Sequence, residues 1–182
     1  MSHQQGQIRK ESGTVHGNEL RLDKDRSEQI IEALNTDLAN SYVLYHQLKK
    51  HHWNVEGAEF RDMHVFLEEA YETVEEGADE IAERAQALGG VPVAGMGALT
   101  DRATVSFEDE NVYDIRTSLE NDLEIYGDII ESIRDHIELA DNLGDYYTGE
   151  MLREILIGVE EDAHHIEHYL EDDSLVLENA LN

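Results

Sequence analysis

Four long stretches of this chain repeat apolar residues at intervals of three or four, the spacing that places side chains on one face of an α-helix. The stretches cover residues 27 to about 54, about 59–88, about 111–139 and about 146–170. No stretch shows a convincing alternation of period two, which is the pattern of a half-buried β-strand. The sequence therefore predicts an all-α fold built on four long helices.

The connections between these helices differ in length. Residues 54–57 and 142–144 are typical of short turns, and Gly89-Gly90 followed by Val91-Pro92 ends the second helix. Residues 91–111 form a long connection, with a short helix predicted over Met96–Arg102. Four helices with one long crossover between the second and the third predict a four-helix bundle of the ferritin-like kind.

The second helix carries the clearest seam of inward-facing residues. Its apolar positions repeat like a heptad, in which Gly77 fills the one gap: Met63, Leu67, Ala70, Val74, Ile81, Ala85 and Leu88. On the third helix the predicted inward face is Ile115, Leu119, Leu123, Tyr126, Ile130, Ile133 and Ile137. These faces together would form one core.

Length and composition indicate one domain. The 182 residues are 40% hydrophobic, which is enough for a single core, and no long linker suggests a second domain. We expect a flexible N-terminal tail over residues 1–25, the bundle over 26–172 and a C-terminal tail over 173–182. No run of about 18 apolar residues predicts a membrane span. The absence of Cys excludes thiolate metal sites, and with no signal-peptide pattern it favours a cytoplasmic protein.

The net charge of −29 is extreme, with 42 acidic residues against 13 Lys and Arg. Such a surface repels itself at low salt and is screened at molar salt, so it indicates adaptation to a salt-rich cytoplasm and attracts cations. Direct DNA binding is disfavoured, because phosphate contacts need clustered Lys and Arg. In the first 25 residues the charges nearly cancel: Arg9, Lys10, Arg21 and Lys24 against Glu11, Glu19, Asp23 and Asp25.

Imidazoles and carboxylates recur on one face of the second helix and at the end of the first. His64 and Glu68 are four residues apart, as are Asp79 and Glu83, and His52 precedes them. At about 100° per residue the four helical positions share an arc of roughly 100°. This donor set suits iron, zinc or manganese.

The two pairs are too far apart to bind one metal ion within a single helix. Glu68 and Asp79 are separated by about 16 Å at ~1.5 Å per residue. Either two weak half-sites exist, or the helix meets a copy of itself across a two-fold axis, which would create two identical complete sites. The alternative is a polar two-fold interface without metal, in which Arg61 and Arg84 neutralise part of the charge. Carboxylates clustered without sufficient cations argue against it, because like charges repel.

Two further features each have two interpretations. Trp53 is either an ordinary core or interface anchor, or an oxidisable neighbour of a metal site. Glu161 and His164 form one Glu-x-x-His unit of an intrabundle di-iron site, but the second helix lacks the matching unit. A polar surface is the favoured interpretation for Glu161, His164 and His168, and a secondary iron-binding patch is the alternative.

The stretch HHWNVEGAEFRDMHVFLEEAYETVEEGADEIAERAQALGG, residues 51–90, resembles the Dps family of mini-ferritins that protect DNA in starved cells, especially its halophilic archaeal members. HWN-x-x-G-x-x-F, the second His, D-x-x-x-E-R and LGG occur in the family's order. The resemblance implies a hollow dodecamer that stores ferric mineral, often with hydrogen peroxide as the oxidant. It also implies a ferroxidase centre shared across a two-fold axis. Position 68 is Glu where the family often has Asp, and the basic tail through which many members bind DNA is missing.

We therefore expect a ferroxidase that binds iron (Fe²⁺/Fe³⁺), as substrate and metal cofactor, through His52, His64 and Glu68 of one chain and Asp79 and Glu83 of another, beside Trp53. Nucleation of mineral is expected at Glu72, Glu75 and Glu76, and an acidic entry pore at Asp141, Asp145 and Glu150. One rival is a DNA-protecting scaffold without iron turnover. The other is an intrabundle di-iron enzyme that uses Glu161 and His164.

Overall fold

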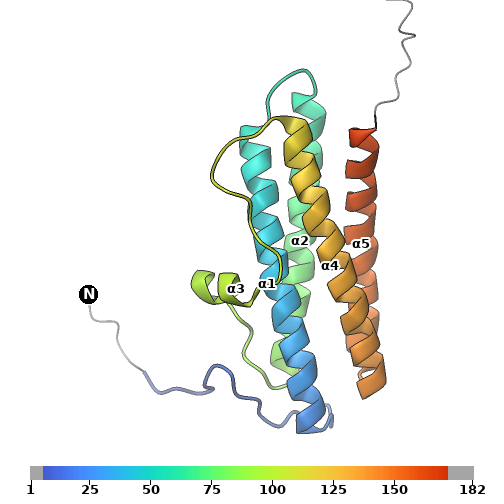
Figure 1. The fold of residues 1–182 in the computed structure, drawn as a ribbon. Helices are drawn as coiled ribbons and strands as arrows, with labels where there is room; N and C mark the ends of the chain where they lie inside the picture. Colours follow the sequence, from blue (N-terminus) through green and yellow to red (C-terminus); the bar gives the residue numbers. More distant parts are fainter. Residues whose placement is uncertain (1–5, 172–182) are drawn as a thin grey trace, which may run out of the picture.

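The chain forms an all-helical bundle in a computed structural model that describes residues 6–171. Within these residues it contains five α-helices and no strand, in the order α1 (Lys24–Asn54), α2 (Phe60–Ala87), α3 (Met96–Arg102), α4 (Ile115–Leu143) and α5 (Tyr146–Leu170) (Figure 1). The predicted four-helix bundle with a long crossover is confirmed. The predicted C-terminal tail, residues 173–182, lies outside the described residues.

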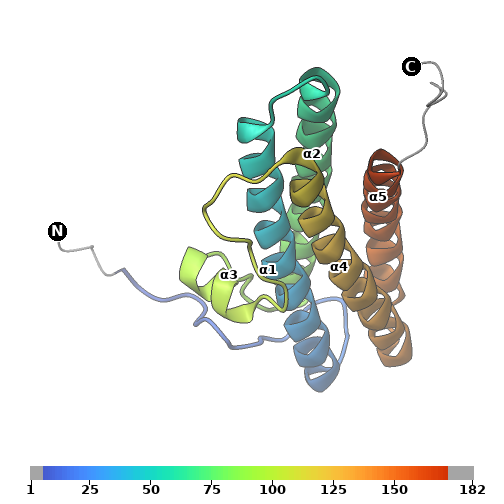
Figure 2. The ribbon, with the colours of Figure 1, turned by 45° about the horizontal axis from the view of Figure 1, so that its top comes forward.

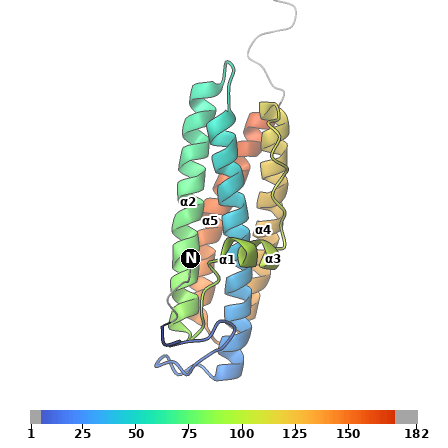
Figure 3. The ribbon, with the colours of Figure 1, turned by 90° about the vertical axis from the view of Figure 1, so that its left-hand side faces the viewer.

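Two helical hairpins make up the bundle. α1 packs beside α2 and α4 beside α5, and the hairpins join through α1 with α4 and α2 with α5 (Figures 1 and 3). The crossover between α2 and α4 runs back along the bundle and carries α3, which packs against α1 (Figure 2). It is needed because a short turn can join only antiparallel neighbours, whereas α2 and α4 run in the same direction.

The predicted apolar seam of α2 lies in the core of the molecule. Every apolar position of that seam is buried, from Met63 to Leu88. Gly77 faces α5 closely, because a Cβ atom there would be 3.3 Å from Ile155 Cγ2. The missing side chain in the heptad therefore leaves room for α5 to pack against α2.

The ends of α4 differ from the prediction of residues 111–139. Asp114 caps the helix by accepting a hydrogen bond from the Thr117 backbone N–H, and Gly144 ends it in the left-handed conformation with φ 81°. The inward face is also different, because Ile125 and Ile129 are buried. Ile115, Leu123 and Ile130, which we predicted to face inward, are only partly buried. The predicted bounds of α3 and α5 are confirmed.

The segment before α1 packs against the bundle where α2 ends. α1 begins at Lys24, which falls inside the predicted tail. The His16 backbone N–H donates to Gly89 O at 3.0 Å, and Asn18 Nδ2 donates to Leu88 O at 3.1 Å. Val15 and Leu22 are partly buried against the core. Residues 15–22 therefore close one end of the bundle. None of the helices in the described residues has the length and apolar character of a membrane span.

Candidate metal centre

His52 and His64 hold each other in place where α1 ends and α2 begins. His52 Nδ1 lies 2.9 Å from His64 O, and His64 Nδ1 lies 3.0 Å from His52 O. A carbonyl oxygen only accepts, so each Nδ1 must carry a proton and donate it. Each Nε2 is left with a lone pair for a metal ion, which is the usual way a second hydrogen bond orients a histidine ligand.

Aromatic rings enclose this histidine pair. The two imidazoles stack with centroids 3.8 Å apart, Phe60 stacks on His64 at 5.1 Å, and Tyr71 meets His52 edge-on at 5.4 Å. The Tyr71 hydroxyl also donates to Glu68 Oε1 over 3.4 Å. The structure thus brings three predicted ligands of one chain, two imidazoles and the Glu68 carboxylate, to one end of the α1–α2 hairpin.

Asp79 and Glu83 lie farther along α2 and are exposed. Neither forms an ion pair with any residue that the structure describes, and no group of three His, Asp or Glu in residues 6–171 is placed to hold a metal ion. One chain alone therefore presents two separate parts of the predicted ligand set. The two-fold arrangement that would unite them stays a prediction.

The contacts of Arg84 argue against the metal-free interpretation, in which Arg84 neutralises carboxylates at a polar two-fold interface. Its Nη2 atom pairs with Asp145 Oδ1 at 2.6 Å, its Nε donates to Thr148 Oγ1 at 2.8 Å, and its guanidinium lies 4.6 Å from the Tyr147 ring centroid. A guanidinium held in this way is not free to neutralise Asp79 and Glu83 of another chain. Arg61, by contrast, is exposed.

The three residues predicted to line an entry pore have different environments. Asp145 is buried and caps α5 by accepting from the Thr148 backbone N–H. Burial raises the pKa of Asp145, but its bonds with Arg84 and Thr148 outweigh this and lower the pKa. Asp141 pairs with Arg153, and Glu150 is exposed. Asp145 therefore has a structural role in the monomer, whereas Glu150 forms no hydrogen bond or ion pair with a residue in the described range 6–171.

The carboxylates predicted to nucleate mineral are all exposed on α2. Glu72 and Glu75 lie on the surface, and Glu76 lines a cavity of about 170 Å³ that α2 and α5 border. Glu80 and Glu154 line the same cavity. The acidic surface at this point thus extends from α2 onto α5.

The Glu161 unit on α5 faces outward, which argues against the intrabundle di-iron interpretation. Glu161, His164 and His168 are exposed, with His164 Nε2 and His168 Nε2 3.0 Å apart. The residue that turns inward is Asp162, which accepts from the Tyr126 hydroxyl at 3.2 Å. Burial raises the pKa of Asp162 to about 6. A buried tyrosine, Tyr126, fills the core at this level.

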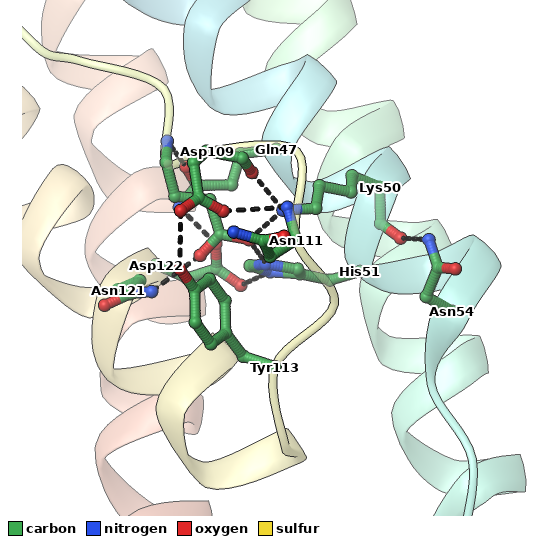
Figure 4. A network of polar contacts seen from close by, with 10 residues as sticks. Gln47, Lys50, His51, Asn54, Asp109, Asn111, Tyr113, Asn121 and Asp122 are labelled. Atoms are coloured by element: carbon green, nitrogen blue, oxygen red, sulfur yellow. Dashed lines mark hydrogen bonds and ion pairs between the residues drawn. The ribbon is translucent and has the colours of Figure 1, made fainter.

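A buried polar network that the sequence interpretation missed surrounds His51, the residue before His52 in the sequence (Figure 4). His51 Nδ1 is 2.8 Å from Asp122 Oδ2 on α4, and His51 Nε2 is 2.8 Å from Glu108 Oε1 in the crossover. Lys50 Nζ reaches the same Glu108 oxygen at 2.5 Å, and Gln47 Nε2 donates to Asp122 Oδ1 at 2.9 Å. The network ties α1, α4 and the crossover together and fixes the end of α1 that carries His52.

The two carboxylates of this network favour the charged form of His51. Burial lowers the pKa of His51, but hydrogen bonds and charge from Asp122 and Glu108 outweigh it and raise the pKa. The signal for the network in the sequence is weak. Gln47 and His51 are four residues apart on α1, and Asp122 precedes the inward Leu123 that we predicted. The apolar repeat of a helix does not indicate buried polar positions such as these.

Comparisons with known proteins show the class to which the chain belongs. A family model described as a ferritin-like domain matches residues 31–176, which defines the class of the chain. The "DNA protection during starvation protein" of Halobacterium salinarum is 67% identical over 178 residues, covering 97% of this chain and 98% of that protein. The crystal structure of an archaeal Dps homologue from the same organism superposes with a TM-score of 0.92, at 67% identity and the same coverage of both chains.

A more distant relative gives the same assignment. A "nutrient stress-induced DNA-binding protein" of Nostoc is 40% identical over 165 residues, covering 91% of this chain and 90% of that protein. The Vibrio cholerae Dps protein, described as a member of a broad superfamily of ferritin-like diiron-carboxylate proteins, superposes with a TM-score of 0.81. It is 28% identical and covers 85% of this chain and 97% of that one. The chain belongs to the Dps family of ferritin-like proteins.

Proposed function

We propose that this protein is an iron-storing ferroxidase that works at sites shared between two subunits of a hollow, cytoplasmic shell, a dodecamer as expected for the family. The observation that carries the proposal is the reciprocal bonding of His52 and His64. It uses both Nδ1 atoms and leaves both Nε2 atoms without a partner among the described residues, at the end of the α1–α2 hairpin where Glu68 also lies. Imidazole with carboxylate is a suitable donor set for ferrous iron.

The proposed site is completed by a second chain. His52, His64 and Glu68 of one subunit bind the substrate iron together with Asp79 and Glu83 of the partner subunit. The exposure of Asp79 and Glu83, without ion pairs to described residues, supports this role because like-charged carboxylates gain by sharing a cation. The net charge of −29 raises the local concentration of ferrous ions around the shell.

Oxidation at this site is proposed to use hydrogen peroxide. Two ferrous ions give one electron each, the O–O bond breaks, and with two protons the products are two ferric ions and two waters. Trp53, whose side chain is exposed, is the oxidisable neighbour that the sequence indicates. Ferric ions then collect on Glu72, Glu75 and Glu76, and Asp141, Asp145 and Glu150 contribute to the proposed entry path, Asp145 by holding the end of α5 in place.

The purpose of this chemistry is proposed to be protection of DNA by removing ferrous iron and peroxide together. The printed names of the relatives from Halobacterium and Nostoc refer to DNA protection and DNA binding. They support, as the second candidate, a scaffold that covers DNA without turning over iron. The nearly neutral N-terminal segment and the acidic surface disfavour direct DNA contact here.

An anaerobic ferrous titration followed by a peroxide pulse tests the proposal. We expect a fast rise of ferric absorbance in the native protein and its loss when His64→Ala and Asp79→Ala are combined. Glu161→Ala is the matched control, because it removes an exposed carboxylate that belongs to the rejected intrabundle site.

An unchanged rate in the double variant would reject the shared site. Loss of turnover in Glu161→Ala alone would instead favour the intrabundle enzyme. Retardation of DNA in a gel at molar salt, with no ferric product, would favour the scaffold.

A further inference from the structure

An unbroken series of aromatic rings leads away from the proposed iron ligands. Tyr71 meets His52 edge-on with centroids 5.4 Å apart, and Tyr45 meets Tyr71 at 5.8 Å and 85°. Tyr42 follows at 6.2 Å and 78° from Tyr45. Each step is an edge-to-face contact, the first two between α1 and α2 and the last within α1. Such a series gives an electron a path of short steps between the metal centre and the side of α1.

The surroundings of Tyr71 favour oxidation only when its proton leaves at the same time. Lys49 Nζ lies 4.3 Å from the Tyr71 ring centroid and also donates to Tyr45 Oη at 3.0 Å. A cation over a ring opposes a second positive charge on that ring. The Tyr71 hydroxyl, however, points to Glu68 Oε1 at 3.4 Å, so a proton acceptor is next to it. The arrangement suits a neutral tyrosyl radical and not a ring cation.

Trp53, the aromatic side chain that the sequence pattern indicates, lacks the ring contacts that Tyr71 has. Its side chain is 67% exposed, and it makes no ring–ring contact with any residue that the structure describes. Tyr71 is 9% exposed and contacts both a proposed ligand ring and a second tyrosine. The electron path that the packing supports therefore starts at Tyr71.

We propose that Tyr71 donates the second electron to hydrogen peroxide when only one ferrous ion occupies the metal centre, and that Tyr45 then re-reduces Tyr71. The proposal rests on the proposed ferroxidase function and adds a role for residues outside the ligand set. It addresses a gap in the two-iron reaction, because a site that holds a single ion has one electron to give and peroxide needs two.

One ferrous ion gives one electron and becomes ferric, and Tyr71 gives one electron with its phenolic proton. The O–O bond of hydrogen peroxide breaks, and with one proton from solvent the two oxygens leave as two waters. Tyr45 next transfers an electron and a proton to Tyr71, which leaves the radical on Tyr45. Without the tyrosine electron, the same single ion would release hydroxide and a hydroxyl radical.

The experiment uses the assembled full chain, loaded without oxygen with fewer ferrous ions than there are proposed sites. One equivalent of peroxide is added and the sample is frozen within the reaction time. We expect a tyrosyl radical by electron paramagnetic resonance, narrowed when tyrosine rings are deuterated. Tyr71→Phe keeps the packed ring and should lose the radical, while trapped hydroxyl radical rises. Tyr146→Phe, which changes an exposed tyrosine, is the matched control and should keep the native signal.

Three results would overturn the proposed electron transfer from Tyr71 and Tyr45. The first is ferric product in the native protein without a tyrosyl radical, and the second is an unchanged radical in Tyr71→Phe. The third is a radical signal that disappears in Trp53→Phe while it persists in Tyr71→Phe. Failure of the ferroxidase proposal looks different, because then ferric product forms at every loading no faster than from free ferrous iron and peroxide. Tyr45→Phe separates the two tyrosines, since it should leave a radical confined to Tyr71 with a changed line shape.

Discussion

His52 and His64 are oriented by each other's backbone carbonyls, so the proposed ligands need no metal ion to set their geometry. The Nε2 atoms are the free donors because both Nδ1 protons are already used. The sequence predicted these two residues and Glu68 by their types and spacing. It could not predict the carbonyl contacts, because those depend on the path of the turn between α1 and α2.

A second histidine, His136, allows a pH prediction away from the proposed site. His136 Nδ1 lies 2.8 Å from Asp37 Oδ2, and Ser132 Oγ donates to Asp37 Oδ1 at 2.9 Å. Burial lowers the pKa of His136, but the bond and charge of Asp37, with the charge of Asp135, outweigh it and raise the pKa. This stabilisation is complete below the unfolded pKa of about 6.5 and is lost as pH rises through the higher folded pKa.

We therefore expect His136→Gln to lower the free energy of unfolding by roughly 1 to 2 kcal/mol below about pH 6, and by progressively less as the pH rises through the folded pKa of His136. Denaturant unfolding at a series of pH values measures the difference. His16→Gln, which changes an exposed histidine, serves as the control. A loss that stays the same at every pH would contradict the assigned charge on His136.

At the scale of elements, the end of α2 depends on one backbone contact with the segment before α1. Gly89 has φ +99°, and a Cβ atom there would lie 2.1 Å from His16 O. We expect Gly89→Ala to lower the free energy of unfolding by about 1–3 kcal/mol, because both the backbone conformation and the packing are lost. Thermal or denaturant unfolding measures the loss.

Gly17→Ala is the matched control for this prediction, since nothing lies within 4 Å of a Cβ atom at Gly17. Equal stability of the two variants would show that residues 15–22 do not depend on the close approach at Gly89. A loss of stability confined to Gly89→Ala would support the dependence of residues 15–22 on that close approach.

The helices themselves were largely predictable, because their apolar repeat is long and regular. The exceptions have local causes. α4 starts at Ile115 and not at residue 111, because the Asp114 side chain caps it, and it continues to Leu143 through the polar Asp141 and Asn142. Asp122 and His51 were missed because a buried polar pair interrupts the apolar pattern that reveals a helix face. Each of these residues is paired with a residue on another element, and spacing along one helix does not reveal that partner.

At the scale of the whole molecule, the net charge of −29 predicts a dependence on salt. The screening length is about 10 Å at 0.1 M ionic strength and about 3 Å at 1 M. We expect the thermal midpoint and the size of the assembly to rise between those conditions, because repulsion between acidic surfaces is screened. Light scattering and a thermal scan at several salt concentrations measure both.

A variant with less charge provides the control for this prediction. Glu120, Glu124 and Glu131 are exposed on α4, and changing all three to Gln removes charge without touching the proposed ligands. The salt dependence should become shallower in this variant. A steeper or unchanged dependence would contradict the role of surface repulsion.

The central claim is that two subunits complete one iron site. Anomalous scattering at the iron absorption edge, from a crystal soaked in ferrous iron, tests it most directly. We expect iron held between His52, His64 and Glu68 of one subunit and Asp79 and Glu83 of its two-fold partner, at both ends of the paired α2 helices. Iron bound by a single chain alone, or these side chains turned away from each other with no iron between them, would contradict it.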